Sequence, residues 1–233
     1  ADEGDEVSLE ESDALQRQRE ERAALTEAFK LDSYRKLFRQ YAKIYDPANP
    51  KEIGVYPWQV DFHNRGAVWP TRVLMSANQI GKSRTASAEI AIHATGEYPP
   101  WWKGKRFDES VRIWTGATTN EKSRDVIQQA LLGPVGQWGT GWIPASRIIG
   151  KPKMRQAGVS DVVDTIHVLH KSRIPSSISL KTFEQGRESW QGVSQNLIWL
   201  DEECPLDIYT EAMTRLVATN GIMIVTFTPL LGI

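Results

Sequence analysis

The sequence predicts an α/β protein: a central, mostly parallel sheet flanked by helices and preceded by a helical arm. Three observations predict this class. Short apolar runs alternate with helical patterns along most of the chain. Two of these runs, residues 197–200 and 222–228, lack polar alternation, as strands buried on both faces do. A glycine-bearing loop joins a third run to a helix, which is a typical strand–turn–helix connection of a parallel sheet.

The composition is that of an ordinary globular protein. Its 233 residues suffice for one large α/β domain or two small ones, and 40% are hydrophobic and 24% charged. The net charge of −1 gives no overall sign of a nucleic-acid binder. A single cysteine, Cys204, excludes an internal disulfide framework and suits a reducing compartment. No apolar run is long enough to span a bilayer, so we expect no membrane partner.

The first fifty residues are predicted to form a tail and an arm. Residues 1–13 hold seven acidic residues and no basic one, which predicts a disordered, solvated tail. Residues 14–50 are predicted to be a helical arm, because apolar side chains recur there at spacings of three and four. These side chains are Tyr34, Leu37, Phe38, Tyr41 and Ile44. The arm packs on the main domain, residues 51–233, or alternatively docks on a neighbouring subunit.

Tyr56 and Gln59 precede the main loop of the domain and offer a way to bind a purine. The Tyr56 ring can stack on a base, and the Gln59 amide presents both a donor and an acceptor to the adenine edge. A core aromatic pair leading into a helix over residues 59–64 is the alternative.

The decisive stretch is an eight-residue loop that follows an apolar run and opens a helix over Lys82–Thr95. Its residues are Ser76, Ala77, Asn78, Gln79, Ile80, Gly81, Lys82 and Ser83. The first turn of a helix offers unpaired N–H groups and the positive end of the helix dipole to a phosphate. Gly81 lets the backbone approach, Lys82 reaches the β- and γ-phosphates, and the Ser83 hydroxyl can ligate Mg²⁺. The pattern predicts a P-loop for ATP, although Ser76 replaces the usual first glycine; a plain helix start is the alternative.

The middle of the chain is predicted to add a strand, a helix and a pair of strands. The strand spans residues 111–117 and the helix ends at Leu132, with Thr118, Thr119 or Asn120 as its cap. The loop after that strand should lie near the P-loop, because parallel sheets bind ligands at the carboxyl ends of their strands. After a Gly-, Pro- and Trp-rich loop, residues 164–170 and 178–183 alternate like paired strands.

The segment from Lys151 to Arg187 is basic, with seven basic residues against three acidic ones. Contacts to DNA phosphates are expected there first, and a solvated face is the alternative.

Two later strands carry further candidate residues. Residues 197–200 run directly into Asp201 and Glu202, which would face the P-loop from the carboxyl end of a buried strand. Asp201 could hold Mg²⁺, and Glu202 could polarise the water that attacks the γ-phosphate; a solvated acidic turn is the alternative. After a helix over residues 206–219, the last strand ends at Thr226 and Thr228, whose hydroxyls can sense the γ-phosphate or merely cap the strand.

Taken in this order, the motifs resemble the ATPase domain of the large terminase subunits of tailed bacteriophages. The segments that carry the resemblance are YPWQ at 56–59, SANQIGKS at 76–83, GRESWQG at 186–192, LIWLDEE at 197–203 and TFTP at 226–229. Large terminases have irregular P-loops, so Ser76 supports the resemblance. It implies a P-loop NTPase fold of the RecA-like, additional-strand type over roughly residues 56–229.

The resemblance also implies residue roles. Lys82 and Ser83 become contacts to phosphate and Mg²⁺, Asp201 becomes the Mg²⁺ carboxylate, and Glu202 becomes the catalytic base. In the same way, Tyr56 and Gln59 match the adenine-contacting segment, and Thr226 and Thr228 belong to the motif that couples hydrolysis to movement. Some relatives carry an arginine within the loop where this chain has Asn78. The arginine finger is therefore expected elsewhere, with Arg187 acting across a ring interface preferred over Arg124.

The implied function is an ATP-driven motor that moves double-stranded viral DNA through a portal into a procapsid. Its implied partners are the portal protein, the small terminase subunit and other copies of itself in a ring. Its implied location is the host cell cytoplasm, transiently docked on the portal. The chain begins at alanine and stops after an apolar run, so we expect a piece of a longer protein, with endonuclease activity only in a carboxyl-terminal domain. A helicase-like ATPase and a nucleotide-gated assembly module without turnover are the rival hypotheses.

Overall fold

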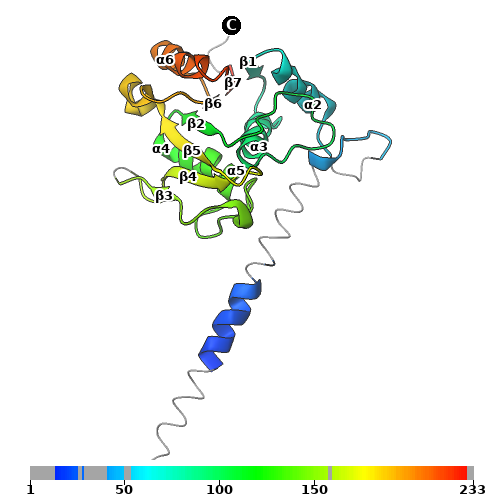
Figure 1. Ribbon diagram of the computed structural model, residues 1–233, viewed down its shortest axis with the longest axis vertical. Coiled ribbons are helices and arrows are strands. Elements are labelled where there is room, and N and C mark those ends of the chain that lie inside the picture. The colour runs from blue at the N-terminus through cyan, green and yellow to red at the C-terminus, as the bar shows by residue number, and fades with distance from the viewer. Residues whose placement is uncertain (1–13, 26–27, 29–40, 50–53, 157–158, 230–233) are drawn as a thin grey trace, which may run out of the picture.

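The computed structural model of the protein describes residues 14–25, 28, 41–49, 54–156 and 159–229. A sheet with helices on both faces forms the body, and a helix over residues 14–25 stands apart from it (Figure 1). The predicted acidic tail and the apolar residues Tyr34, Leu37 and Phe38 of the predicted arm lie outside the described residues. Within the described ranges, no helix is both long and apolar enough to cross a bilayer.

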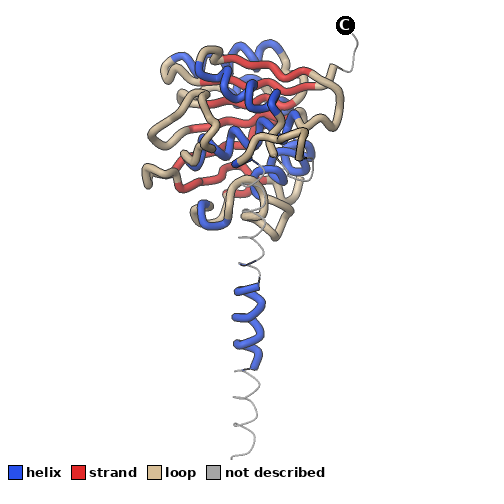
Figure 2. The backbone as a smooth tube through the Cα atoms, turned by 90° about the vertical axis from the view of Figure 1, so that its right-hand side faces the viewer, coloured by secondary structure: helices blue, strands red, loops and turns tan. Residues whose placement is uncertain are grey.

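Seven strands of the described chain form one sheet in the order β1-β7-β6-β2-β5-β4-β3. Figure 2 shows the strands of this sheet lying side by side. They are β1 (Thr71–Met75), β2 (Arg112–Ala117), β3 (Lys153–Met154), β4 (Val163–Leu169), β5 (Pro175–Thr182), β6 (Leu197–Asp201) and β7 (Ile222–Phe227). The first five strands in spatial order run parallel to one another. β4 pairs antiparallel with β5, and β3 pairs antiparallel with β4. β7 lies between β1, which enters the P-loop, and β6, which carries the acidic residues. This inserted strand confirms the predicted additional-strand fold class.

The helices also follow the predicted order. The α-helices are α2 (Pro57–Asn64), α3 (Lys82–Thr95), α4 (Asn120–Lys122), α5 (Gln129–Leu132) and α6 (Leu206–Val217); shorter or irregular turns are η1 (Arg65–Ala67), η2 (Ser123–Gln128), η3 (Ala145–Arg147), η4 (Phe183–Gln185) and η5 (Arg187–Trp190). α4, the π-helical η2 and α5 together form the predicted helix after β2. Of the three candidate caps, the Thr119 hydroxyl accepts a hydrogen bond from the Lys122 N–H at 3.3 Å.

Two apolar layers attach the helices to the sheet. Ile90 of α3 packs on one face with Trp199 of β6, and Ile208 of α6 packs on the other face with Ile198. All five residues of β6 are buried, because both faces of this central strand are covered. The absence of polar alternation in its sequence therefore reflects its position in the middle of the sheet.

A polar cluster is buried beneath the α3 face. The Glu89 carboxylate of α3 accepts hydrogen bonds from Arg72 of β1 at 2.5 and 3.1 Å, from His63 of α2 at 2.6 Å and from His93 at 3.4 Å. Burial raises the pKa of Glu89, but the Arg72 charge and the two histidine hydrogen bonds outweigh it and hold that pKa well below its usual range. The cluster ties together β1, α2 and α3, the elements that surround the P-loop.

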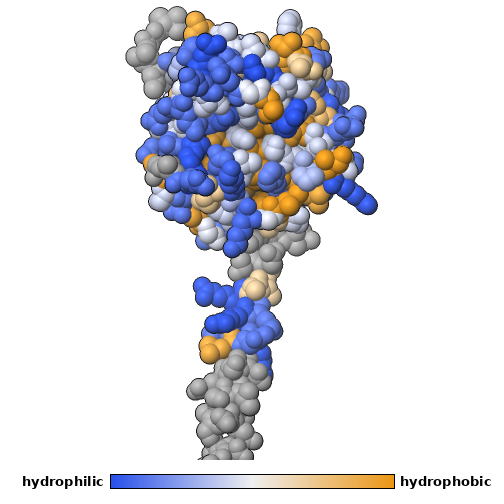
Figure 3. Space-filling view, turned by 60° about the vertical axis from the view of Figure 1, so that its left-hand side comes forward, coloured by the Kyte–Doolittle hydropathy of each residue, from blue (hydrophilic) through white to orange (hydrophobic). Residues whose placement is uncertain are grey.

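The end of the predicted arm packs on the body. Tyr41 is buried, its carbonyl accepts a hydrogen bond from the Trp101 indole at 2.6 Å, and its ring meets the edge of Trp142 at 4.9 Å. Ile44, assigned to the same apolar stripe, is instead exposed. The helix over residues 14–25 is exposed throughout, with mostly hydrophilic residues on the side that Figure 3 shows.

Several element boundaries differ from the sequence prediction by one to three residues, and one short strand was not predicted. Pro175, expected in the turn before β5, is its first residue, where the missing N–H breaks no interior ladder. The loop over residues 133–158 contains the two-residue strand β3, which pairs with β4 through a register shift. A pair this short gives no recognisable alternation.

Candidate nucleotide-binding site

The P-loop connects the carboxyl end of β1 to the first turn of α3. Gly81 has a φ of 96° and Gln79 a φ of 64°, both in the left-handed region, where glycine carries no steric penalty. The chain turns sharply there and starts α3 at Lys82. The first N–H groups of α3 have no intrahelical acceptors and so provide the donors that an anion needs.

Lys82 is the central donor of the loop. Its side chain is buried, and Nζ donates hydrogen bonds to the Ser76 carbonyl at 2.9 Å, the Ala77 carbonyl at 2.8 Å and Thr228 Oγ1 at 2.8 Å. The Thr228 hydroxyl donates in turn to Asn78 Oδ1 at 2.8 Å. The lysine therefore joins the P-loop directly to the end of β7.

Asp201 closes the site from the neighbouring strand. Its Oδ1 accepts hydrogen bonds from Thr226 Oγ1 at 2.5 Å and from Ser83 Oγ at 3.2 Å, and the ladder pairs Asp201 with Thr226. Burial raises the pKa of Asp201 to about 6; the Thr226 hydrogen bond opposes this, and the negative charge of Glu202 adds to it. A cation at this carboxylate would stabilise its ionised form.

The oxygen donors here fit Mg²⁺. This ion prefers oxygen ligands and is usually held by one or two carboxylates together with phosphates, without an all-protein cage. Within the ranges that the structure describes, no group of three or more His, Cys, Asp or Glu side chains could hold a metal alone. Ser83 and Asp201 would hold the ion, and its charge would neutralise negative charge on the transferring phosphate.

Glu202 follows Asp201 in an unusual backbone conformation. Its φ is 75°, and its N–H donates to the Thr226 carbonyl at 2.7 Å, so the β6–β7 ladder continues past the end of β6. A non-glycine residue in this region costs on the order of 1–3 kcal/mol, and such residues concentrate at functional sites. The ladder fixes the backbone of Glu202 next to Asp201.

A cavity of about 290 Å³ lies beside the P-loop. Its lining residues are Tyr41, Gly54, Val55, Tyr56, Gln59, Gln79, Ile80, Gly81 and Arg84. The Gln59 amide has a fixed orientation there: Oε1 accepts from the Tyr56 N–H at 3.0 Å and Nε2 donates to Thr85 Oγ1 at 2.7 Å. Thr85 can only accept from Gln59, because its hydroxyl donates to the Gly81 carbonyl at 2.9 Å. The half-exposed Tyr56 ring lies 5.2 Å from that of Tyr45.

Tyr41 and Arg84, which line this cavity, and Thr85, which accepts from Gln59, were not identified as site residues from the sequence. Arg84 and Thr85 follow the P-loop motif directly, so their position in the first turn of α3 was the available signal. Tyr41 was assigned only to the apolar stripe of the arm. Its position at the cavity beside the P-loop depends on the fold, and no pattern in the neighbouring sequence indicates it.

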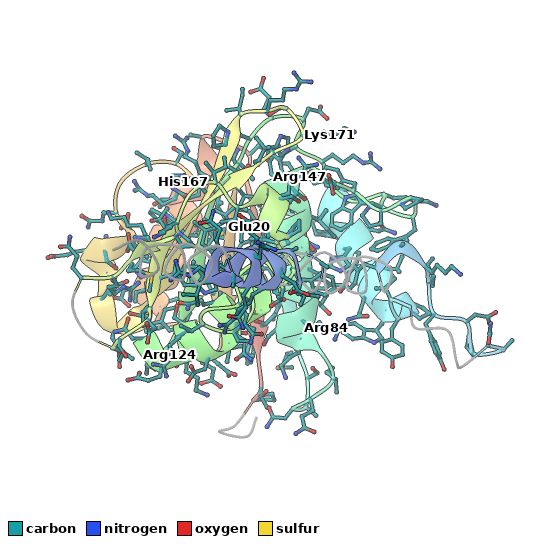
Figure 4. All side chains as sticks on the ribbon, turned by 90° about the horizontal axis from the view of Figure 1, so that it is seen from below. Glu20, Arg84, Arg124, Arg147, His167 and Lys171 are labelled. Atoms are coloured by element: carbon teal, nitrogen blue, oxygen red, sulfur yellow. The ribbon has the colours of Figure 1, made fainter. Side chains whose placement is uncertain are left out.

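Neither candidate arginine finger reaches the P-loop within this chain. Arg187 of η5 lies on the α6 face and donates to Glu211 at 3.1 and 3.2 Å, with 57% of its side chain exposed. Arg124 pairs with Asp125 at 2.7 Å and lies well apart from Arg84 (Figure 4). A role of either arginine across a subunit interface stays a prediction.

The proximity of the loop after β2 to the P-loop stays a prediction. β2 neighbours β6, so its carboxyl end is one strand from Asp201, whose carboxylate accepts a hydrogen bond from Ser83. Both β6 and β7 separate β2 from β1.

The basic segment is only partly available to phosphates. Arg155 donates to Asn120 and to the Leu180 carbonyl, Lys181 donates to the Ser189 carbonyl at 2.6 Å, and Arg187 pairs with Glu211. Lys153 forms an exposed ion pair with Asp164 at 3.8 Å. Contacts to DNA, which stay a prediction, would depend on this lysine and on Lys151, Lys171 and Arg173.

Comparison with known proteins agrees with the fold. Residues 73–232 match the family described as terminase large subunit, T4likevirus-type, N-terminal. The large terminase subunit of Salmonella phage P22 is 37% identical over 201 residues, which cover 78% of this chain and 40% of that protein. The large terminase of the thermophilic bacteriophage D6E has a similar fold, with a TM-score of 0.50 at 11% identity over 73% of this chain and 38% of that one. The chain thus spans less than half the length of either protein. Because the family match includes the P-loop, β6 and β7, the chain belongs to the large terminase subunit family of the T4likevirus type.

Proposed function

We propose that this chain is an ATP-hydrolysing motor domain that drives double-stranded viral DNA through a portal into a procapsid. The observation that supports this most directly is the convergence of Lys82, Ser83, Asp201 and Thr228 at one end of the parallel sheet. These residues come from three elements, and their donors and carboxylate match what a Mg²⁺-bound triphosphate requires. Membership of the terminase family supports the same reaction.

Each residue has a defined part in the proposed hydrolysis. The first N–H groups of α3 and Lys82 bind the β- and γ-phosphates, and Ser83 and Asp201 hold Mg²⁺. Glu202 orients the attacking water and accepts its proton. Gln59 presents a donor and an acceptor in a fixed orientation to the adenine edge.

Coupling to movement is assigned to β7. Thr226 contacts Asp201 and Thr228 contacts Lys82, so both the metal carboxylate and the phosphate-binding lysine are bonded to the same strand. A change in bonding at the phosphates therefore reaches β7 through two hydroxyls.

The proposed assembly is a ring of copies docked on the portal in the host cell cytoplasm, with the small terminase subunit as a further partner. Arg187 of one copy would act as the arginine finger at the nucleotide site of the next copy. Its exposed side chain supports this role. On assembly, the guanidinium would leave Glu211 and contact the phosphate bound by the neighbouring copy. Such an arginine contributes about 10³–10⁵ in rate. An isolated copy should therefore hydrolyse ATP slowly.

The test is ATP binding and hydrolysis by the chain, by Glu202→Gln and by the matched control Glu203→Gln. Glu203 is the next residue and is exposed. Each protein is measured alone, with procapsid portal, with double-stranded DNA and with single-stranded DNA. Turnover that rises steeply on assembly, survives in Glu203→Gln and falls by orders of magnitude in Glu202→Gln, with binding retained, would support the proposal.

Other outcomes favour the rival functions. Turnover that ignores the portal but rises with single strands would indicate a helicase-like ATPase. Binding without turnover in every assembly would indicate a nucleotide-gated assembly module. If Arg187→Ala leaves assembly-stimulated turnover intact, the cross-subunit role of that arginine is wrong.

A further inference from the structure

We infer that Trp199 is a positioning residue that fixes the Asp201 carboxylate for Mg²⁺ through the hydroxyl of Thr226. The inference rests on the proposed function, because it concerns how the same site holds its cation. Trp199 lies two residues before Asp201 in β6 and is fully buried. Its Nε1 donates to Thr226 Oγ1 at 2.8 Å, and Thr226 Oγ1 donates to Asp201 Oδ1 at 2.5 Å.

The hydrogens available on each group fix the direction of the two hydrogen bonds from Trp199 to Thr226 and from Thr226 to Asp201. An indole N–H can only donate, a hydroxyl has one hydrogen and two lone pairs, and an ionised carboxylate can only accept. Trp199 therefore occupies a lone pair of Thr226, and the single hydrogen of that hydroxyl points to Asp201. Hydrogen bonds in such a chain polarise one another, which strengthens the bond to the carboxylate.

The strand register makes the contact possible. Trp199 and Asp201 are two residues apart, so both side chains project from the same face of β6, toward α3. β7 places Ile224 opposite Trp199 and Thr226 opposite Asp201. The Trp199 indole therefore reaches diagonally across the two strands to the Thr226 hydroxyl. Asp201, on the same strand as Trp199, accepts a hydrogen bond from that hydroxyl.

The hydrogen bond of Trp199 is not a general requirement of this core. Trp190 is equally buried, in the apolar layer on the α6 face, and its Nε1 has no hydrogen-bond partner among the residues that the structure describes. Burial alone therefore does not account for the pairing at position 199. Trp190 is also the matched control, because its replacement by phenylalanine removes the same atoms without removing a hydrogen bond.

The arrangement determines which carboxylate oxygen faces a cation. Oδ1 of Asp201 accepts from both Thr226 and Ser83, so the second oxygen is the one left for the ion or its water. Loss of a partner that directly orients a metal ligand usually weakens metal affinity by about 10–100-fold. Trp199 acts one hydrogen bond further out, so a smaller effect, about 3- to 10-fold, is expected from its loss.

The experiment measures the Mg²⁺ concentration that gives half-maximal binding of a fluorescent ADP, and separately half-maximal ATP hydrolysis. Trp199→Phe should raise both Mg²⁺ concentrations about 3- to 10-fold, and Trp190→Phe should leave them unchanged. Nucleotide binding in EDTA should be the same in all proteins, because the base cavity and the P-loop are untouched. Introducing β-(3-benzothienyl)alanine at position 199, which keeps the shape of tryptophan without its N–H, gives the same test without a cavity.

A double-mutant comparison separates positioning from packing. Thr226→Val should raise the Mg²⁺ requirement at least as much as Trp199→Phe does, Thr226→Ser should retain normal values, and Trp199→Phe should add nothing in the Thr226→Val background. An added effect in that background, or equal effects of Trp199→Phe and Trp190→Phe, would overturn the inference. A wild-type chain whose nucleotide binding ignores Mg²⁺ would instead overturn the proposed function.

Discussion

Replacing Asp201 by asparagine should stabilise the protein even as it abolishes Mg²⁺-dependent hydrolysis. The pKa of Asp201 rises from 3.8 to about 6, chiefly through burial. The unfolded chain therefore ionises this group more readily than the folded one does. The contribution of the protonated Asp201 to the free energy of unfolding is fully present below about pH 4. It is lost as the pH rises toward about 6, and the protein stays less stable above that pH. A shift of about two units corresponds to at most about 3 kcal/mol at pH 7.

The assay is urea unfolding in EDTA between pH 4 and pH 7, compared between wild type and Asp201→Asn. The free energies of unfolding should agree near pH 4 and differ by about 1–3 kcal/mol at pH 7, with the variant more stable. The Oδ1 of an asparagine can still accept the hydrogen bonds that Thr226 and Ser83 donate, so the comparison isolates the charge. Asp108→Asn, at an exposed aspartate, should give no such divergence. A wild-type protein that is as stable as the variant at pH 7, or a difference that does not change with pH, would refute the reasoning.

Two further substitutions test the frame of the site. Glu89→Gln removes the carboxylate bonded to Arg72 and leaves the charge of a buried guanidinium without its counter-ion, so the free energy of unfolding should fall by about 3–5 kcal/mol. A loss below about 1 kcal/mol in urea unfolding would contradict the role of the cluster. Gly81→Ala puts a side chain at a φ of 96°, so it should cost about 1–2 kcal/mol of stability and weaken ADP binding at least tenfold. The matched change Ser87→Ala, inside α3, should leave ADP binding unaltered. Equal ADP affinities of wild type, Gly81→Ala and Ser87→Ala in calorimetric titration would argue against a phosphate-binding turn.

Features that depend on residues adjacent in the sequence could be predicted. The strand–loop–helix unit was predicted because Gly81 and Lys82 mark the turn and the helix start, and the burial of β6 was predicted because its residues show no alternation. The order of the strands could not be obtained in this way. Nothing local in residues 222–228 indicates that β7 inserts between β1 and β6.

The details of the site that depend on register were also beyond the sequence. Thr226 was predicted to sense the γ-phosphate or to cap the strand, and that role stays a prediction. Its hydroxyl donates to Asp201, which the ladder sets opposite it, and accepts from Trp199. Trp199 was taken for an apolar strand residue, since its indole N–H matters only once β7 is beside it. The Glu89 cluster had one overlooked signal: Glu89 and His93 are four residues apart and so share the buried face of α3.

The bonding of Lys82 has a consequence for the timing of events at this site. An ammonium group has three hydrogens, and the Ser76 carbonyl, the Ala77 carbonyl and the Thr228 hydroxyl accept all of them. Any phosphate oxygen that Lys82 binds must therefore compete with one of these three acceptors. Two of them keep the P-loop folded on itself, and the third holds the tip of the inserted strand. A phosphate that displaced the Thr228 hydroxyl would therefore release the tip of the inserted strand, whereas one that displaced a carbonyl would loosen the P-loop.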